Sequence, residues 1–495
     1  MKKVSGYRLI FGYLGIFLIF IGCTCLFPLV LLAFYPEEAH YWLNFFIPGM
    51  VTVAIGAGLM QLVRGVKGAK LGKHQDSVLL ILIWVLAILI CAIPFLCRGD
   101  MTFSQAIFET TSGFATIGLT VFTDFSSHIY VFYRAFCNLI GGVGLVLIIT
   151  TAISDRYGLK LYIAEGHSDK PLPNLKKSAM VIFGIYLGII FVGTMAYCFA
   201  GVPFFDALVH SICAVSTGGF SSKENGLLGL NVDGISFPAV EIISIVLMIL
   251  GSINFLTHFL ILTGHGKKAI KDIELRLFAV FTLAAIPVFF ISSAMRGSLG
   301  WSYESFRTST FTYVSAITTT GFSNISDLRL LGEATMLLVV FVNIVGGGMG
   351  STSGGVKLYR VAVAGKSFYW STRERLGHSR MVYPHFINRC GEEKEITKSE
   401  SFEAFGYIIL YCVILILGGF LVTLFSEFPY NDSLFEFSNA LAGTGLTNGL
   451  SFACRDNPVV LWIMIVGMFA GRLEILAIYF AFYRVIRDIC HKDTL

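Results

Sequence analysis

The chain has 495 residues, of which 55% are hydrophobic and only 14% are charged. An average soluble domain carries about 25% charged residues, so this composition excludes a water-soluble globule. The apolar residues suffice for about ten spanning helices of roughly 20 residues each. A net charge of +5 is compatible with a nucleic-acid partner, but in a membrane protein Lys and Arg more often mark the cytoplasmic loops. We therefore expect no nucleic acid.

Ten apolar stretches are long enough to be membrane spans. They lie at about 9–34, 41–63, 78–97, 129–153, 178–200, 238–262, 275–294, 335–364, 405–425 and 458–483. If both termini are cytoplasmic, 28 of the 36 Lys and Arg residues fall in cytoplasmic segments and seven in outside loops. This asymmetry follows the positive-inside rule and fits an even number of spans. The sequence thus predicts an all-α, multi-pass membrane protein with both termini in the cytoplasm.

A short motif recurs four times in the loops predicted to lie outside. Each copy reads small, apolar, small, small, any residue, Gly, Leu or Phe, then Ser or Thr. The glycines are Gly118, Gly219, Gly321 and Gly445, which are 101, 102 and 124 residues apart. Thirteen positions before them stand residues able to cap a helix, namely Gln105, Asp206, Thr308 and Asp432. The predicted unit is a span, a short capped helix, a glycine strand and a second span.

This repeated unit is suited to replacing the water molecules around an ion. Irregular backbone at membrane depth is tolerated only where it is packed in protein or lines water. Four such strands on one axis would present rings of carbonyls that can replace an ion's hydration shell. Glycine permits a positive φ that turns carbonyls inward, and the C-terminal ends of the short helices favour a cation. The predicted backbone ligands are Thr116, Ile117, Gly118, Thr217, Gly218, Gly219, Thr319, Thr320, Gly321, Gly443, Thr444 and Gly445.

The apolar stretch at 335–364 is interrupted by a glycine-rich segment. Each glycine costs about 1 kcal/mol in a helix, so we expect a non-helical loop that lines a cavity. Its predicted residues are Gly346, Gly347, Gly348, Gly350, Ser351, Thr352, Ser353, Gly354 and Gly355. The segment is similar to a phosphate-cradling loop but lacks the Gly-Lys-Ser/Thr ending. A packing or kinking role is the alternative to gating.

Three further sets of polar residues lie in or beside apolar segments. Arg472 is within the last span, where a charge costs at least about 2.5–3.5 kcal/mol, so it should face the interior, with an ion pair to Glu474 as one interpretation. Arg134 begins a span and is predicted to be an interfacial anchor. Nine positions before the four motif glycines stand Glu109, His210, Thr312 and Glu436. We expect this third group to brace the short helices rather than to ligate ions.

With these motifs the chain resembles the TrkH and KtrB superfamily of bacterial potassium transporters over essentially its whole length. Further similar stretches are Gly141-Gly142-Val143-Gly144, residues 254–259 and 346–357, and Gly471-Arg472-Leu473-Glu474. The resemblance implies ten transmembrane helices, with four tandem span–pore-loop–span repeats around one central pore. The additional N-terminal helix pair is typical of the TrkH branch.

The resemblance also implies a function and partners. It implies potassium uptake across the bacterial inner membrane, with potassium as the bound ion, no organic cofactor, and a gate formed by loop 346–355 and Arg472. Glycine in all four motifs is typical of potassium rather than sodium transport. A homodimer in contact with membrane lipid is implied, together with a cytosolic nucleotide-binding regulatory ring of the TrkA type that docks on the basic cytoplasmic face.

The implied boundaries are an N-terminal two-helix region at 1–74, pore repeats at 75–165, 166–266, 267–365 and 404–495, and a basic cytoplasmic loop at 366–403. The alternative is a ten-span secondary transporter of a cation or small solute with inverted repeats. In that case the halves would have opposite orientations, whereas the four motifs share one orientation. Neither HExxH nor GxSxG occurs in the sequence, and we do not expect an enzyme.

Overall fold

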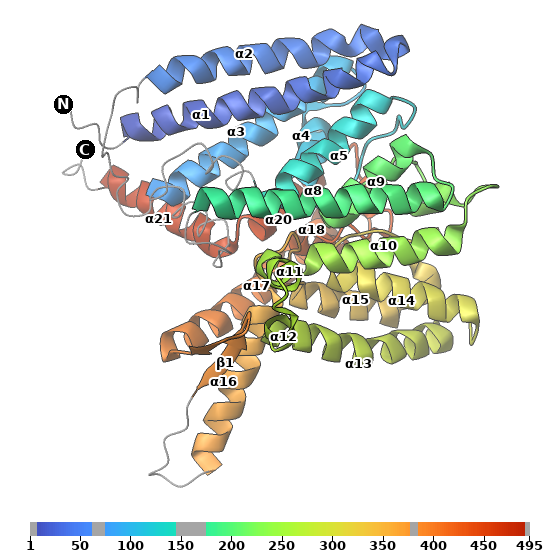
Figure 1. Ribbon diagram of the computed structural model, residues 1–495, viewed down its shortest axis with the longest axis vertical. Coiled ribbons are helices and arrows are strands. Elements are labelled where there is room, and N and C mark those ends of the chain that lie inside the picture. The colour runs from blue at the N-terminus through green and yellow to red at the C-terminus, as the bar shows by residue number, and fades with distance from the viewer. Residues whose placement is uncertain (1–6, 62–74, 145–174, 377–384, 491–495) are drawn as a thin grey trace.

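The protein is described by a computed structural model that covers residues 7–61, 75–144, 175–376 and 385–490. Parts of the predicted cytoplasmic segments, and the end of the predicted span at 129–153, lie outside the described residues. The described chain is predominantly helical, and most of its long helices run side by side in one bundle, from which α16 (Leu358–Leu376) extends away (Figure 1).

The N-terminal helices form a pair at one edge of the bundle (Figure 1). Helix α1 (Tyr7–Leu26) is joined through two 3₁₀ turns, η1 (Phe27–Ala33) and η2 (Pro36–Tyr41), to α2 (Trp42–Met60). A Cβ added to Gly15 would lie 2.7 Å from the carbonyl oxygen of Gly56, and one added to Gly22 would lie 2.7 Å from that of Gly49. Glycine at these crossings allows the two helix backbones to pack closely.

Four short helices each lie in the chain between a long apolar helix and a second apolar helix. The short helices are α4 (Phe103–Phe114), α9 (Phe204–Val215), α14 (Tyr303–Ile317) and α18 (Tyr430–Ala442). They are preceded by α3 (Gln75–Arg98), α8 (Leu175–Phe199), α13 (Ile273–Arg296) and α17 (Lys398–Phe425). They are followed, after a loop, by α5 (His128–Val143), α10 (Phe237–Ser252), α15 (Glu333–Val345) and α20 (Pro458–Arg472). Short elements η4 (Gly226–Leu230), η5 (Leu328–Leu331) and α19 (Leu450–Ala453) lie in those loops.

The short helices start slightly earlier than the sequence suggests. Thr102 caps α4 in a capping box with Gln105, and Ser302 caps α14. Helices α9 and α18 begin directly after Pro203 and Pro429. The predicted caps Gln105, Asp206 and Asp432 therefore stand in the first turn, and Thr308 stands farther inside its helix. A carboxylate in the first turn still interacts favourably with the helix dipole.

Several predicted spans are broken rather than continuous. Helices α10 and α11 (Phe255–Leu262) meet at 103°. Helix α15 is separated by the glycine-rich loop from α16 (Leu358–Leu376), and α20 is separated from α21 (Ile475–Cys490) by Leu473 and Glu474. Within the described residues, six helices are long and apolar enough to cross a membrane, or up to seven if α10 and α11 count as one span.

The basic segment predicted as a loop has structure of its own. After α16 come strands β1 (Phe386–Arg389) and β2 (Glu392–Glu395), an antiparallel hairpin, while the short helix α12 (Gly266–Ile270) precedes α13. A second apolar cluster joins the hairpin to α16 and α17 through Tyr359, Val363, Trp370, Ile387, Ile396 and Ala404. The prediction of helices alone was therefore incomplete in this segment.

Burial places the short helices at the centre of the bundle. Every residue from Gln105 to Phe114 in α4 is buried. By contrast, the long helices expose large apolar side chains, including Phe191, Leu283 and Leu424. An apolar outer surface around a polar interior is the arrangement that a lipid bilayer requires of helical proteins.

Candidate functional site

The four segments that follow the short helices share one backbone conformation. Positive φ values of 50–77° occur at Thr116, Thr217, Thr319 and Gly443. Two residues later, φ is 65–93° at Gly118, Gly219, Gly321 and Gly445. A positive φ at threonine costs about 1–3 kcal/mol and persists only where the surroundings impose it. Because left-handed residues alternate with ordinary ones, successive carbonyls can point to the same side of each strand.

The four strands contact one another in a closed order. A Cβ added to Gly118 would lie 2.6 Å from the carbonyl oxygen of Gly218 on the second strand. Likewise, a Cβ on Gly219 would overlap with Thr320 of the third strand, and one on Gly321 with Thr444 of the fourth. A Cβ on Gly445 would overlap with Ile117 of the first strand. First meets second, second meets third, third meets fourth and fourth meets first, so the strands form a ring.

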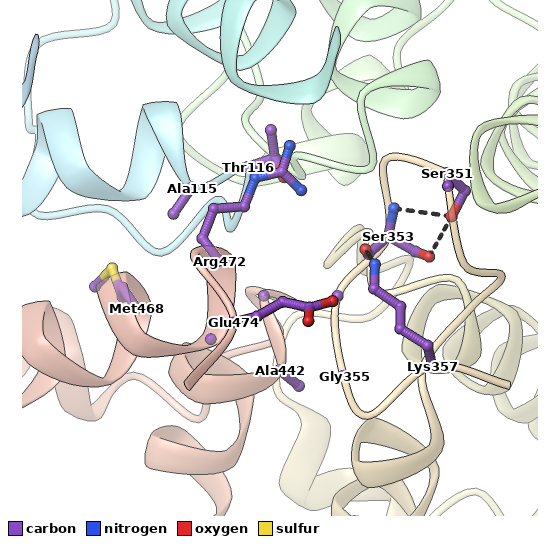
Figure 2. Close-up of a pocket in the computed structure, with 14 residues that line it drawn as sticks. Ala115, Thr116, Ser351, Ser353, Gly355, Lys357, Ala442, Met468, Arg472 and Glu474 are labelled. Atoms are coloured by element: carbon purple, nitrogen blue, oxygen red, sulfur yellow. Dashed lines mark hydrogen bonds between the residues drawn. The ribbon is translucent and has the colours of Figure 1, made fainter. Parts of the chain in front are cut away.

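The ring separates two cavities. One, of about 410 Å³, is lined by all four motif glycines and the loops that follow them. The other, of about 30 Å³, is lined by Ala115, Thr116, Ala442 and Gly443 at the opposite ends of the first and fourth strands. The rest of this small cavity is lined by loop residues Gly350, Ser351, Ser353, Gly354, Gly355 and Lys357, and by Met468, Gly471, Arg472 and Glu474 (Figure 2). The glycine-rich loop therefore lies directly below the ring.

The loop between α15 and α16 is hydrogen-bonded to two of the strands. The Thr217 hydroxyl donates to the Thr352 hydroxyl at 3.1 Å, and the Gly354 amide donates to the Thr319 hydroxyl at 2.7 Å. On its other side the loop is held by Glu274, whose carboxylate accepts the Met349 amide at 3.0 Å. The loop thus links the ring to the start of α13.

Arg472 is the last residue of α20, next to the break before α21. Its guanidinium donates to the Thr352 carbonyl at 3.1 Å and also to the Gly141 carbonyl of α5. In Figure 2 the side chain extends from α20 towards Thr116. Glu474 forms its ion pair with Arg360, with Nη2 and Oε2 2.6 Å apart. The structure therefore gives Glu474 a different salt-bridge partner from the one that the sequence suggested for it.

One of the predicted ion ligands, the Gly218 carbonyl, is already bonded to protein groups. The Gly218 carbonyl accepts hydrogen bonds from the Asn138 side chain at 3.1 Å and from the Phe220 amide at 2.9 Å. Its oxygen therefore has the least capacity left for an ion among the predicted positions. The sequence did not predict that Asn138 bonds to this strand. A polar amide within an apolar helix is nevertheless a sign of a buried hydrogen bond.

Arg134 is not an interfacial anchor. Its side chain is buried and pairs with Glu109 across 2.6 Å. The same guanidinium donates to the Thr120 hydroxyl at 2.8 Å and lies 4.1 Å from the ring centre of Phe220. A buried ion pair needs such additional partners.

The sequence also did not predict the role of Asn343 at the fourth strand. Its side chain accepts a hydrogen bond from the Thr444 hydroxyl at 3.0 Å and donates one to Asn439.

A model of the TrkH family, described as cation transport protein, matches residues 42–487. The chain belongs to the TrkH family. Together with its membrane-length helices, this makes the chain a membrane transporter and not an enzyme, as the sequence predicted. The expected resemblance to this family is confirmed.

Individual relatives match the chain over nearly its full length. The Trk system potassium uptake protein TrkH of Salmonella typhimurium is 27% identical, covering 96% of this chain and 98% of its own. An uncharacterized cation transporter of Methanocaldococcus jannaschii is 29% identical, covering 97% and 96%. The crystal structure of the potassium transporter TrkH from Vibrio parahaemolyticus has the same fold, with a TM-score of 0.81 at 24% identity and coverage of 96% and 98%.

The crowding of the strands predicts how glycine replacements differ. Gly445 and Gly449 both have positive φ values, 77° and 89°, but only Gly445 has neighbours within 4 Å that an added Cβ would meet. Each change to alanine should lower the free energy of unfolding by about 1–2 kcal/mol, because alanine is strained in the left-handed conformation. Gly445→Ala should cost more, because the first strand must also move. Thermal unfolding in detergent checks this, and equal losses would contradict the close contact of the strands.

Proposed function

We propose that this protein takes up potassium ions across a bacterial inner membrane through the ring of four strands. The observation that carries the proposal is the closed order of four strands with the same positive-φ pattern, placed between two cavities. Rings of backbone carbonyls can replace the hydration shell of an ion. The names of relatives as potassium uptake proteins support potassium as the ion.

The proposed ligands are backbone oxygens on all four strands. They come from residues 116–118, 217, 219, 319–321 and 443–445, and Gly218 is omitted because two protein groups already bond to its carbonyl. No organic cofactor is part of the proposal. Carbonyl rings alone do not set the preference for potassium over sodium. Glycine in all four motifs supports potassium.

The proposed membrane arrangement has ten spans, with both termini cytoplasmic. Six are the continuous apolar helices. Three are the interrupted pairs α10 with α11, α15 with α16, and α20 with α21, and the tenth begins with α5. Four tandem repeats then surround one pore, with α1 and α2 outside them. The ring order of four equivalent strands supports this arrangement over two inverted repeats.

Loop 346–355 and Arg472 form the proposed gate. The cavity below the ring has a volume of only about 30 Å³, against about 410 Å³ for the cavity on the other side of the ring. Arg472 brings a positive charge to this cavity, which opposes a cation that leaves the ring. Because Arg472 also donates to Thr352, a movement of the loop would displace the charge and the backbone together.

The proposed assembly is a homodimer in lipid, controlled by a cytosolic nucleotide-binding ring of the TrkA type. The basic segment that follows the gate supports a docking face, because α16 exposes Phe368, Tyr369 and Leu376 beside Arg373 and Arg375. Exposed aromatic and arginine side chains are typical of protein interfaces.

Cation uptake tests the proposed ion directly. In cells that lack their own potassium uptake systems, the protein should take up rubidium, the potassium substitute, much faster than sodium. Equal rates for the two ions would contradict the preference for potassium. If neither ion is taken up by correctly inserted protein, the transport proposal itself is wrong.

Removal of the positive charge of Arg472 should raise the rate of ion uptake. Arg472→Ala is expected to increase rubidium uptake by roughly tenfold, the effect of a unit charge a few ångströms from the ion path, while the preference over sodium remains. Arg472→Lys keeps the charge and serves as the control with near wild-type flux. Unchanged uptake by well-folded Arg472→Ala would exclude a barrier role.

The regulatory partner is tested by purification. The full-length protein, isolated from its own membrane in mild detergent, should carry a soluble nucleotide-binding protein. Charge reversal at Arg373 and Arg375 should release it. A partner that remains bound after this double change would place the docking face elsewhere.

A further inference from the structure

Each strand of the ring is followed by a hydroxyl residue that lies eleven positions after one side chain of the preceding short helix. In the first repeat the two residues are Glu109 and Thr120. The Thr120 hydroxyl lies 3.0 Å from both carboxylate oxygens of Glu109, and the Val121 amide donates to Glu109 Oε2 at 3.0 Å. A single buried carboxylate thus ties the outer end of the strand to its own short helix.

The fourth repeat repeats this geometry. The Thr447 hydroxyl donates to Glu436 Oε1 at 2.7 Å, and the Asn448 amide donates to Oε2 at 3.1 Å. The Ser451 amide adds a third bond at 3.0 Å. Glu436 is fully buried, and Glu109 is almost so. Hydrogen bonds to an ionised carboxylate are stronger than those between neutral groups.

The second repeat replaces the carboxylate with an imidazole. His210 Nε2 lies 3.0 Å from the Ser221 hydroxyl, and the next residue, Ser222, donates to Asp206 Oδ1 at 2.6 Å. Both His210 and Asp206 belong to α9, so this strand is also attached to its own short helix. The side chain on the short helix differs between these repeats. In each of them, however, the second and third residues after the motif glycine are the ones that bond to the helix.

The third repeat lacks this attachment. The hydroxyl of Thr312, at the equivalent position, is buried and has no hydrogen-bond partner among the described residues. Ser323 bonds to the Ile325 carbonyl instead, at 2.9 Å. The following residue, Asn324, donates to Glu241 at 2.7 Å. Glu241 lies on α10, in the preceding repeat, so the third strand is held from outside its own repeat.

We propose that Glu109, His210 and Glu436 are positioning residues that set the carbonyl spacing of the ring, and that Glu241 performs this task for the third strand. The inference rests on the proposed function and adds to it the residues that determine ion preference. The distances between the backbone oxygens are one factor in ion preference, and those oxygens belong to irregular strands without a regular ladder of hydrogen bonds. The side chains behind the strands therefore have to fix these distances.

The fourth repeat offers the cleanest test, because Glu436 bonds to a single hydroxyl and to backbone amides. In the full-length protein expressed in cells, Glu436→Ala and Thr447→Val should each lower the ratio of rubidium to sodium uptake by roughly tenfold, a factor within the range for one hydrogen bond to a charged group. Glu436→Gln keeps one acceptor oxygen and should give an intermediate ratio. Glu241→Gln should lower the ratio through the third strand.

Thr312→Val is the matched control, since it removes an unpartnered hydroxyl at the same position of the third repeat. Its ratio should equal that of the wild type. If Glu436→Ala does not reach the membrane, Thr447→Val decides the question, because it leaves the buried carboxylate and its amide donors in place.

Two results would overturn the inference alone. One is a wild-type ratio in correctly inserted Thr447→Val and Glu436→Gln, and the other is an equally large loss in Thr312→Val. A wild-type protein that does not prefer rubidium over sodium would instead overturn the proposed function on which the inference rests. The two failures are therefore separable in one set of measurements.

Discussion

Close contact between four backbone strands is the constraint on which the rest of the structure depends. Each motif glycine faces a carbonyl of the next strand at a distance that a Cβ would not permit. Irregular strands cannot satisfy their own polar groups in a bilayer. They must therefore be surrounded by protein, and the buried short helices and the longer apolar helices outside them supply that surrounding. The ring thus explains both the four motif glycines and the layered bundle.

The same ring is connected to the hairpin of β1 and β2 through a set of hydrogen bonds. The hydroxyls of Thr217 and Thr319 bond to the glycine-rich loop, and Glu274 holds that loop at Met349. Two residues earlier in the chain, Asp272 accepts the Cys390 amide of the hairpin at 2.8 Å. Burial raises the pKa of the Asp272 carboxyl above its usual value. Protein groups at the hairpin and at the ring are therefore linked through the start of α13.

Much of this arrangement was predictable, for identifiable reasons. Gly118 and its three counterparts were found because a repeat with constant spacing survives in sequence when local propensity is uninformative. The break at Gly346 followed from helix propensity. The pairing of Arg134 with Glu109 and the bond from Asn138 to Gly218 were not predictable, because they join different helices and depend on rotation about each helix axis. The hairpin was missed because charged residues in the segment obscured its short strands.

The position of bound ions tests the role of the ring most directly. A crystal structure of the full-length protein grown in rubidium, with anomalous diffraction measured at the rubidium edge, would locate the ion without assumptions about chemistry. Rubidium should lie on the axis of the ring, between the large cavity and the small one, beside Gly118, Gly219, Gly321 and Gly445. Ordered rubidium bound elsewhere in the protein, with none on this axis, would contradict a carbonyl-lined ion path.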